Sequence, residues 1–87
     1  MHRTTARFWS CFHALPEPTQ KLARRNFELL KENPRHPSLR FKKVGKLWSA
    51  RAGRSHRALA MEDNDGYIWV WIGTHEEYDR LLDGSHT

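Results

Sequence analysis

Two residues near the end of the chain, a histidine and a tyrosine, have side chains that can transfer a proton to or from a substrate. His75 follows Gly73-Thr74 at the end of an apolar run, and Tyr78 comes three residues later. The segment 75–82 has a helix-forming composition, which would place the two side chains on one helical face. Histidine is the side chain that most readily exchanges a proton near neutral pH. The spacing therefore makes His75 a candidate for proton exchange, with Tyr78 beside it on the same helical face.

Three arginines precede this pair, around a turn between two strand-like runs. Arg51, Arg54 and Arg57 could hold a phosphate group, because guanidinium groups bind phosphate oxygens in bidentate geometry. Together with His75, and without metal ligands, they suit cleavage of RNA by its own 2′-hydroxyl. The arginines would stabilise the added negative charge, and a proton donor would assist the leaving oxygen. The alternative is a structural role, in which His75 caps its helix and the arginines pair with the acidic residues Glu76, Glu77 and Asp79.

The histidines and the cysteine do not predict a metal site. Six histidines are spread along the chain without the spacing of a metal-binding motif, and Cys11 is the only cysteine. We interpret His2 and His86 as residues of the chain ends. We therefore expect neither a bound metal nor a cofactor.

The positive charge is concentrated in the middle of the chain. The 87 residues include 15 Lys and Arg against 10 Asp and Glu, a formal net charge of +5. Segment 35–57 has eight basic and no acidic residues, whereas 62–83 has seven acidic residues and one basic residue, Arg80. Such a patch attracts phosphate backbones, although a solvated basic surface or a groove for an acidic protein segment would look the same. The candidate nucleic-acid-binding residues are Arg40, Lys42, Lys43, Lys46, Arg54 and Tyr78.

Length and composition favour one small domain spanning 1–87. No apolar run approaches the length of a membrane span, and the N-terminus lacks the apolar stretch of a secretory signal. Hydrophobic residues make up 38% of the chain, enough for a folded core. We expect a cytoplasmic protein with a polyanionic partner and no membrane association.

The hydrophobic pattern predicts an α+β fold. Segments 6–14 and 16–32 show helical spacing and are separated by prolines, so they read as a helical hairpin. Short strand-like runs separated by turn residues then predict a four-stranded antiparallel meander, followed by a C-terminal helix at 75–82. The runs are 39–44, 47–52, 56–62 and 67–72. The last is apolar throughout and should lie centrally in the sheet, and 1–5 could add a fifth strand at an edge.

In order and spacing, several short motifs resemble the RelE/ParE toxin superfamily over residues 7 to 83. They are Leu15-Pro16, Asn33-Pro34-x-His36-Pro37-Ser38-Leu39, Trp48-Ser49-x-Arg51, His56-Arg57-Ala58-Leu59 and Trp71-Ile72-Gly73-x-His75-x-x-Tyr78. The resemblance implies a small antiparallel sheet with an N-terminal helical hairpin and a C-terminal helix. This is the architecture that the hydrophobic pattern predicts.

The resemblance also implies a toxin of a type II toxin–antitoxin pair. RelE-like members cleave mRNA in the ribosomal A site, so Arg57 would contact the scissile phosphate and Arg51 would supply a second basic group. His75 falls where RelE has arginine and where some relatives use histidine as the general acid. The second lysine of the RelE pair has no counterpart here. The stacking tyrosine of the family aligns nearer Leu81, which leaves Tyr78 as its candidate substitute.

Two alternatives to a ribosome-dependent endoribonuclease follow from the same resemblance. ParE-like members poison DNA gyrase, in which case His75 and Arg57 would be structural. A catalytically inactive member would act only as a binding protein. The implied partners are a cognate antitoxin protein with mRNA and the ribosome, or gyrase for a ParE-like protein.

Overall fold

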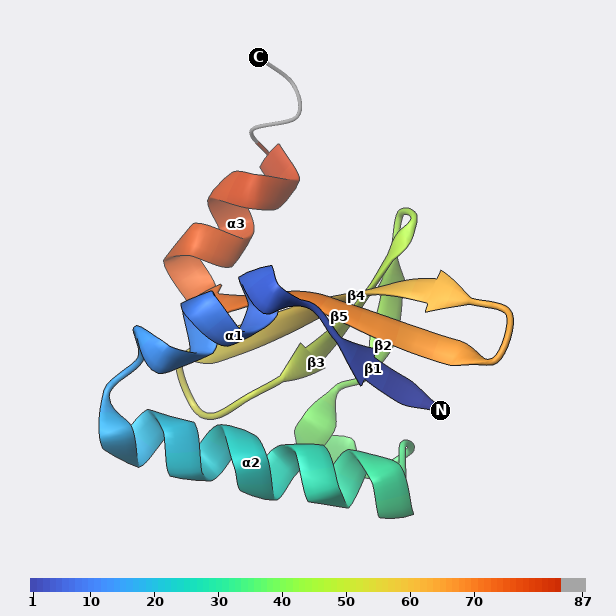
Figure 1. Ribbon diagram of the computed structural model, residues 1–87, viewed down its shortest axis with the longest axis horizontal. Helices are drawn as coiled ribbons and strands as arrows, with labels where there is room; N and C mark the ends of the chain where they lie inside the picture. Colours follow the sequence, from blue (N-terminus) through green and yellow to red (C-terminus); the bar gives the residue numbers. More distant parts are fainter. Residues whose placement is uncertain (84–87) are drawn as a thin grey trace.

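The computed structural model describes residues 1–83 and confirms the α+β fold, with helices on both sides of a single sheet (Figure 1). The predicted order of helices and strands is also confirmed. The elements are β1 (His2–Thr4), α1 (Ala6–His13), α2 (Glu17–Glu32), a 3₁₀ helix (Pro37–Leu39), β2 (Lys42–Val44), β3 (Leu47–Arg51), β4 (His56–Asp63), β5 (Gly66–Thr74) and α3 (His75–Asp83).

The sheet has five strands in the order β1-β5-β4-β3-β2. The four strands from β2 to β5 form the predicted antiparallel meander. The N-terminal segment adds the fifth strand, which pairs in parallel with β5 and makes the sheet mixed. The Met1 ammonium donates to the Asp65 carbonyl at 2.8 Å. A Cβ at Gly66, whose φ is +154°, would collide with the Met1 backbone. The absence of a side chain at Gly66 therefore allows the N-terminal segment to approach β5.

The first strand of the meander is shorter than the sequence indicates. The pattern predicts a strand over 39–44, but Pro37–Leu39 forms a 3₁₀ helix and β2 begins at Lys42. The reason is local: His36 Nδ1 accepts a hydrogen bond from the Ser38 amide at 3.2 Å, and Pro37 fixes the first helical φ. Leu39, only 1% exposed, therefore reaches the core from a helical turn and not from a strand.

The two faces of the sheet differ in character. The register aligns Ala50, Ala58 and Ile72 across three strands, and all three belong to the apolar core on the side of α1 and α2. Because neighbouring residues of a strand alternate between faces, Arg51 and Arg57 point to the opposite side. Figure 1 shows α2 and α3 on opposite sides of the sheet. We call the side that carries the two arginines and α3 the arginine face.

Two smaller interpretations from the sequence are wrong. His2 is not a loose end residue: it lies in β1, and its ring stacks on Tyr67 with the centroids 5.5 Å apart. The helical spacing of 16–32 also predicts that Leu22 lies on the apolar face of this helix, but Leu22 is 44% exposed, while Ala23 and Leu30 are buried. His86 lies outside the described residues. Within residues 1–83, none of the helices is long and apolar enough to span a bilayer.

Candidate active site

Arg51 and Arg57 form a direct cross-strand pair on the arginine face. They are Cα partners in the antiparallel ladder of β3 and β4, and on the next strand Arg57 is paired with Gly73. Directly opposed side chains have Cβ atoms about 4.5–5.5 Å apart, and like charges in such a pair repel. The fold therefore places two positive charges close together on the sheet. Their repulsion is unfavourable, and a bound anion would reduce it.

The guanidinium group of Arg57 is only partly satisfied. Its Nη1 atom is buried and has no hydrogen-bond partner among the described residues. Burial and then the charge of Arg51 lower the pKa of Arg57, with a smaller lowering by Arg40, while Tyr78 and Asp79 raise it. A buried donor without an acceptor is costly. An anion that accepts from Nη1 would remove this cost and balance the repulsion.

Helix α3 brings a tyrosine and a histidine to this arginine pair. Tyr78 is 7% exposed, and it is close enough to Arg57 to oppose the lowering of the arginine pKa. The His75 ring lies on the same helix with its centroid 5.9 Å from the Tyr78 ring. Its Nδ1 atom is 3.1 Å from Oδ2 of Asp79. The arginine face thus gathers two cations, a phenol and an imidazole–carboxylate pair.

The start of α3 is fixed by a reciprocal pair of hydrogen bonds. Thr74 Oγ1 accepts from the Glu77 amide at 3.1 Å, and Glu77 Oε1 accepts from the Thr74 amide at 2.9 Å. This is a capping box, and the bonds from the Thr74 amide and hydroxyl lower the pKa of Glu77. The His75 amide donates to the Ser55 carbonyl at 2.8 Å. His75 is therefore held as the first residue of α3, against the turn between β3 and β4.

The other predicted basic residues are not all near the arginine pair. Arg40 is close enough to lower the pKa of Arg57. Lys42 is paired with Ser49 and so points to the arginine face, whereas Lys43 is paired with Trp48, in the row that faces the helices. Lys46 lies in the β2–β3 turn, at the end of β3 remote from Arg51, and Arg54 lies in the β3–β4 turn.

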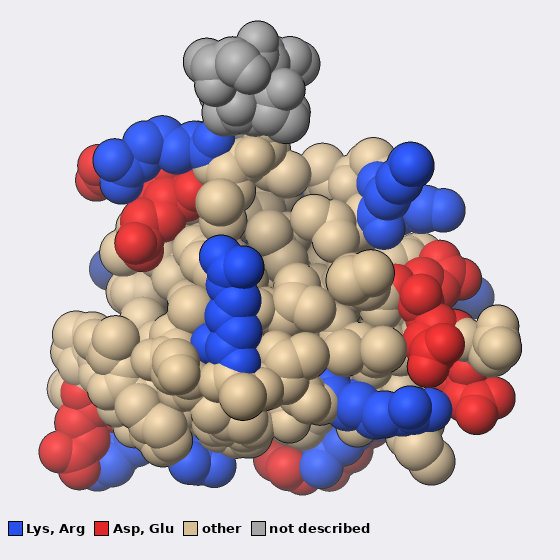
Figure 2. All heavy atoms as spheres, turned by 45° about the horizontal axis from the view of Figure 1, so that its top comes forward, with Lys and Arg blue, Asp and Glu red and all other residues tan. Residues whose placement is uncertain are grey.

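The positive charge does not coat the molecule evenly. On the face drawn in Figure 2, charged side chains of both signs lie mostly around the rim, with a broad uncharged area between them. A net charge of +5 on so small a chain could have produced a uniform basic surface. The grouping of Arg40, Arg51 and Arg57 follows from the strand pairing and from the effect of Arg40 and Arg51 on the pKa of Arg57.

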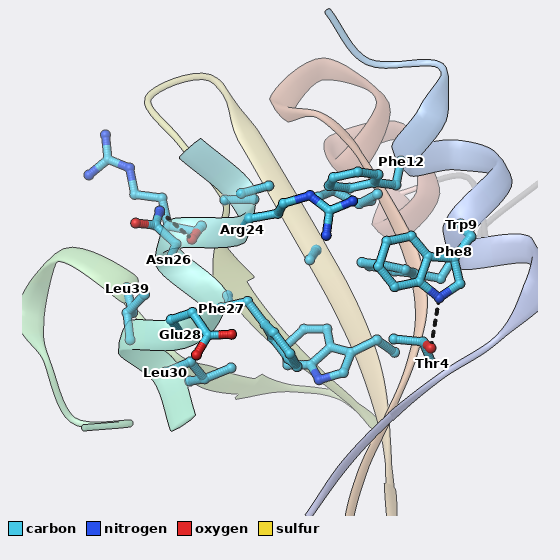
Figure 3. Close-up of a pocket in the computed structure, with 17 residues that line it drawn as sticks. Thr4, Phe8, Trp9, Phe12, Arg24, Asn26, Phe27, Glu28, Leu30 and Leu39 are labelled. Carbon is cyan, nitrogen blue, oxygen red and sulfur yellow. Dashed lines mark hydrogen bonds between the residues drawn. The ribbon is translucent and has the colours of Figure 1, made fainter. Parts of the chain in front are cut away.

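A cavity of 430 Å³ lies on the other side of the sheet, between α1, α2 and the strands (Figure 3). Its wall is largely apolar and includes Phe12 and Phe27. The guanidinium group of Arg24 lies 4.8 Å from the centre of the Phe12 ring. Asn26 donates to the Arg51 carbonyl at 3.2 Å, which joins α2 to the strand that carries the site. Arg51 is among the residues that line this cavity, whereas Arg57 is not.

Two further parts of the site have signals in the sequence that were not used to predict it. Thr74-x-x-Glu77 matches the capping-box pattern, which agrees with the predicted start of α3 at His75 and identifies what fixes it. Asp79 lies four residues after His75, the spacing at which helical side chains meet. The described residues include no group of three or more side chains that could hold a metal ion.

Solved structures identify the fold. No protein-family model and no curated protein matches the sequence. A chain of the RelB–RelE antitoxin–toxin complex from Methanococcus jannaschii superposes with a TM-score of 0.71 at 12% identity, covering 91% of this chain and 96% of that one. The RelBE2 toxin–antitoxin complex of Mycobacterium tuberculosis gives 0.64 at 18% identity, with coverage of 85% and 95%. The isolated E. coli RelE toxin gives 0.62 at 10% identity, with 95% of each chain covered. This chain therefore has the fold of the RelE toxins.

Proposed function

We propose that the protein is the toxin of a type II toxin–antitoxin pair and that it cleaves mRNA on the ribosome. The observation that carries the proposal is the buried, unpartnered Nη1 atom of Arg57 opposite Arg51. Paired guanidinium groups with free donors match the oxygens of a phosphodiester. The likeness to RelE structures supports the same assignment through the fold.

The proposed reaction needs no metal ion. The 2′-hydroxyl of the substrate gives its proton to solvent water as its oxygen attacks the adjacent phosphorus, the bond from phosphorus to the 5′-oxygen breaks, and a 2′,3′-cyclic phosphate forms. Arg57 and Arg51 stabilise the negative charge that accumulates on the phosphoryl oxygens. His75 gives a proton to the departing 5′-oxygen. Tyr78, whose ring centroid is 5.9 Å from that of His75, is the proposed contact to the nucleotide.

The partner that we propose is a RelB-type antitoxin. Two of the similar structures described above, those from Methanococcus jannaschii and Mycobacterium tuberculosis, are toxin–antitoxin complexes. Such a partner would bind the folded toxin and not the unfolded chain, and so would stabilise this small domain by mass action. The substrate partners are mRNA and the ribosome, and the site of action is the cytoplasm.

The test is induced expression of the wild type and of His75→Ala and Arg57→Ala, with growth, translation rate and mRNA 5′ ends measured. The proposal expects growth arrest and new 5′ ends within coding frames for the wild type. Both effects should be lost in the two variants, because general acid catalysis alone contributes about 10²–10⁴-fold. Arg25→Ala is the matched control, since Arg25 is an exposed arginine of α2 away from the arginine face.

The variants must also be shown to fold, by circular dichroism and thermal unfolding of the purified proteins. Folded variants that remain toxic would contradict the role of the arginine face. Growth arrest with intact mRNA and accumulated cleaved DNA would indicate a ParE-like gyrase poison instead. No arrest at all would indicate an inactive member of the superfamily that acts by binding.

A further inference from the structure

The contact between His75 and Asp79 is specific to one ring nitrogen. Nδ1 of His75 lies 3.1 Å from Oδ2 of Asp79, one helical turn later, and the side chains are 48% and 55% exposed. An ionised carboxylate can only accept a hydrogen bond, so Nδ1 must carry the proton in this contact. A neutral imidazole has one N–H, and Nε2 is then left without a proton.

Asp79 acts electrostatically on Arg57 as well as contacting His75. Its charge raises the pKa of Arg57, against the larger lowering by burial and by Arg51. Tyr78 acts on Arg57 in the same direction as Asp79, and Arg40 acts in the opposite one. Asp79 therefore contacts the proposed proton donor and also influences one of the proposed phosphate-binding groups.

We propose that Asp79 is a positioning residue that holds the Nδ1–H form of His75, so that Nε2 is the atom that exchanges the proton with the substrate. This inference rests on the proposed function. In the imidazolium, Nδ1–H stays bonded to Asp79 and Nε2–H is the proton available to the leaving 5′-oxygen. After transfer, the neutral ring keeps its proton on Nδ1, and Nε2 is ready to be protonated again.

A plain surface ion pair would have a different consequence. Exposed pairs of this kind contribute about 0.2–1 kcal/mol to stability, and their loss would not affect the choice of ring nitrogen or the rate of the chemical step. A residue that orients a catalytic histidine acts on the tautomer and on kcat. The tautomer of His75 and the value of kcat therefore distinguish a positioning role of Asp79 from that of a surface ion pair.

The experiment compares the wild type with Asp79→Asn and Asp79→Ala, using Glu76→Gln as the control. Glu76 is an exposed acid on the same helix for which no ion pair is observed. Long-range ¹H–¹⁵N NMR of the whole protein reads which ring nitrogen of neutral His75 carries the proton. Cleavage of a defined mRNA on programmed ribosomes gives kcat and KM for the same proteins.

We expect the Nδ1–H tautomer in the wild type and in Glu76→Gln, and a shift toward Nε2–H in both Asp79 variants. The variants should lose about 10- to 100-fold in kcat, less than the roughly 10²–10⁴-fold that the proton donor itself supplies, with KM within about twofold of the wild type. An unchanged tautomer, or a change in KM alone, would overturn the proposal. If the wild type cleaves no RNA, the proposed function fails, and the tautomer still decides whether Asp79 orients His75.

Discussion

At the scale of single residues, the main feature is a pair of arginines opposite each other on neighbouring strands. Their like charges make the fold less stable than a single arginine at this place would. Arg51 and Arg57 are register partners, and burial leaves Nη1 of Arg57 without an acceptor. Repulsion and an unsatisfied donor both reduce stability. A fold keeps such an arrangement at a functional site when a ligand of opposite charge relieves it. The same two residues therefore explain a local loss of stability and the proposed affinity for phosphate.

A second residue-scale effect makes stability depend on pH. Trp69 Nε1 donates to Nδ1 of His2 at 3.0 Å, and burial, followed by the charges of the N-terminal ammonium and Lys31, lowers the pKa of His2 from 6.5. The unfolded chain therefore takes up this proton at a higher pH than the folded chain. The free energy of unfolding is unaffected by this group well above pH 6.5 and falls as the pH drops below it.

We expect His2→Asn to weaken this dependence, because the Asn side chain can accept from Trp69 but does not titrate. The measurement is urea unfolding of both proteins at pH values from about 5 to 8. Part of the slope should remain, since burial also lowers the pKa of His56. Parallel pH profiles for the two proteins would contradict the assignment to His2.

At the scale of elements, α3 determines where the side chains of His75 and Tyr78 lie. It begins directly after β5, so His75 is the first helical residue and the chain has no loop in which its position could vary. The capping box of Thr74 and Glu77 fixes that first turn. Tyr78 then packs toward the sheet with 7% of its surface exposed. The position of the site thus depends on one helix terminus.

We expect Thr74→Ala to lower the free energy of unfolding by about 1 kcal/mol, the usual contribution of an N-cap hydroxyl. Activity should fall further than stability explains, because the turn that holds His75 frays. Thr74→Ser is the control, since it keeps the hydroxyl that bonds to the Glu77 amide. Denaturant unfolding and the ribosome cleavage assay test the two effects, and equal stability of all three proteins would contradict the capping role.

At the scale of the whole molecule, the side of the sheet that faces the helices is underpacked. Three alanines, Ala50, Ala52 and Ala58, lie on the sheet side of the 430 Å³ cavity, and their small side chains leave space below the helical hairpin. Apolar side chains around a cavity lose contacts that a filled core would supply. This domain therefore has room for stabilisation on the side opposite the site.

We expect Ala58→Val to raise the free energy of unfolding by about 0.5–2 kcal/mol, as cavity-filling substitutions commonly do. Ala60→Val is the matched comparison: Ala60 is fully buried on the same strand but does not line the cavity. Overpacking there should cost about 1–3 kcal/mol. Thermal unfolding of the two variants should therefore shift in opposite directions, and a loss of stability in both would show that the cavity cannot take the added methyl groups.

Much of this architecture follows from local signals. The prolines and the helical spacing predict α1 and α2, and the turn residues between apolar runs predict the meander from β2 to β5. The prediction of secondary structure is less accurate where a single side-chain hydrogen bond or a contact between distant parts of the sequence determines the structure. At Pro37–Leu39, a side-chain hydrogen bond favours a 3₁₀ turn over a strand. At His2–Thr4, three residues carry too little pattern to reveal a partner strand at the other end of the chain.

The sequence by itself determined the residue types of the candidate site and the elements that carry them. Arg51, Arg57, His75 and Tyr78 could be named because each lies at the end of a strand or at the start of a helix, where local rules apply. Only the tertiary structure decided that Arg51 and Arg57 share one face, since register across a turn can slip by one residue and reverse every side chain. The tertiary structure also shows that Nη1 of Arg57 is buried without a hydrogen-bond partner among residues 1–83, because burial depends on segments that are distant in the sequence.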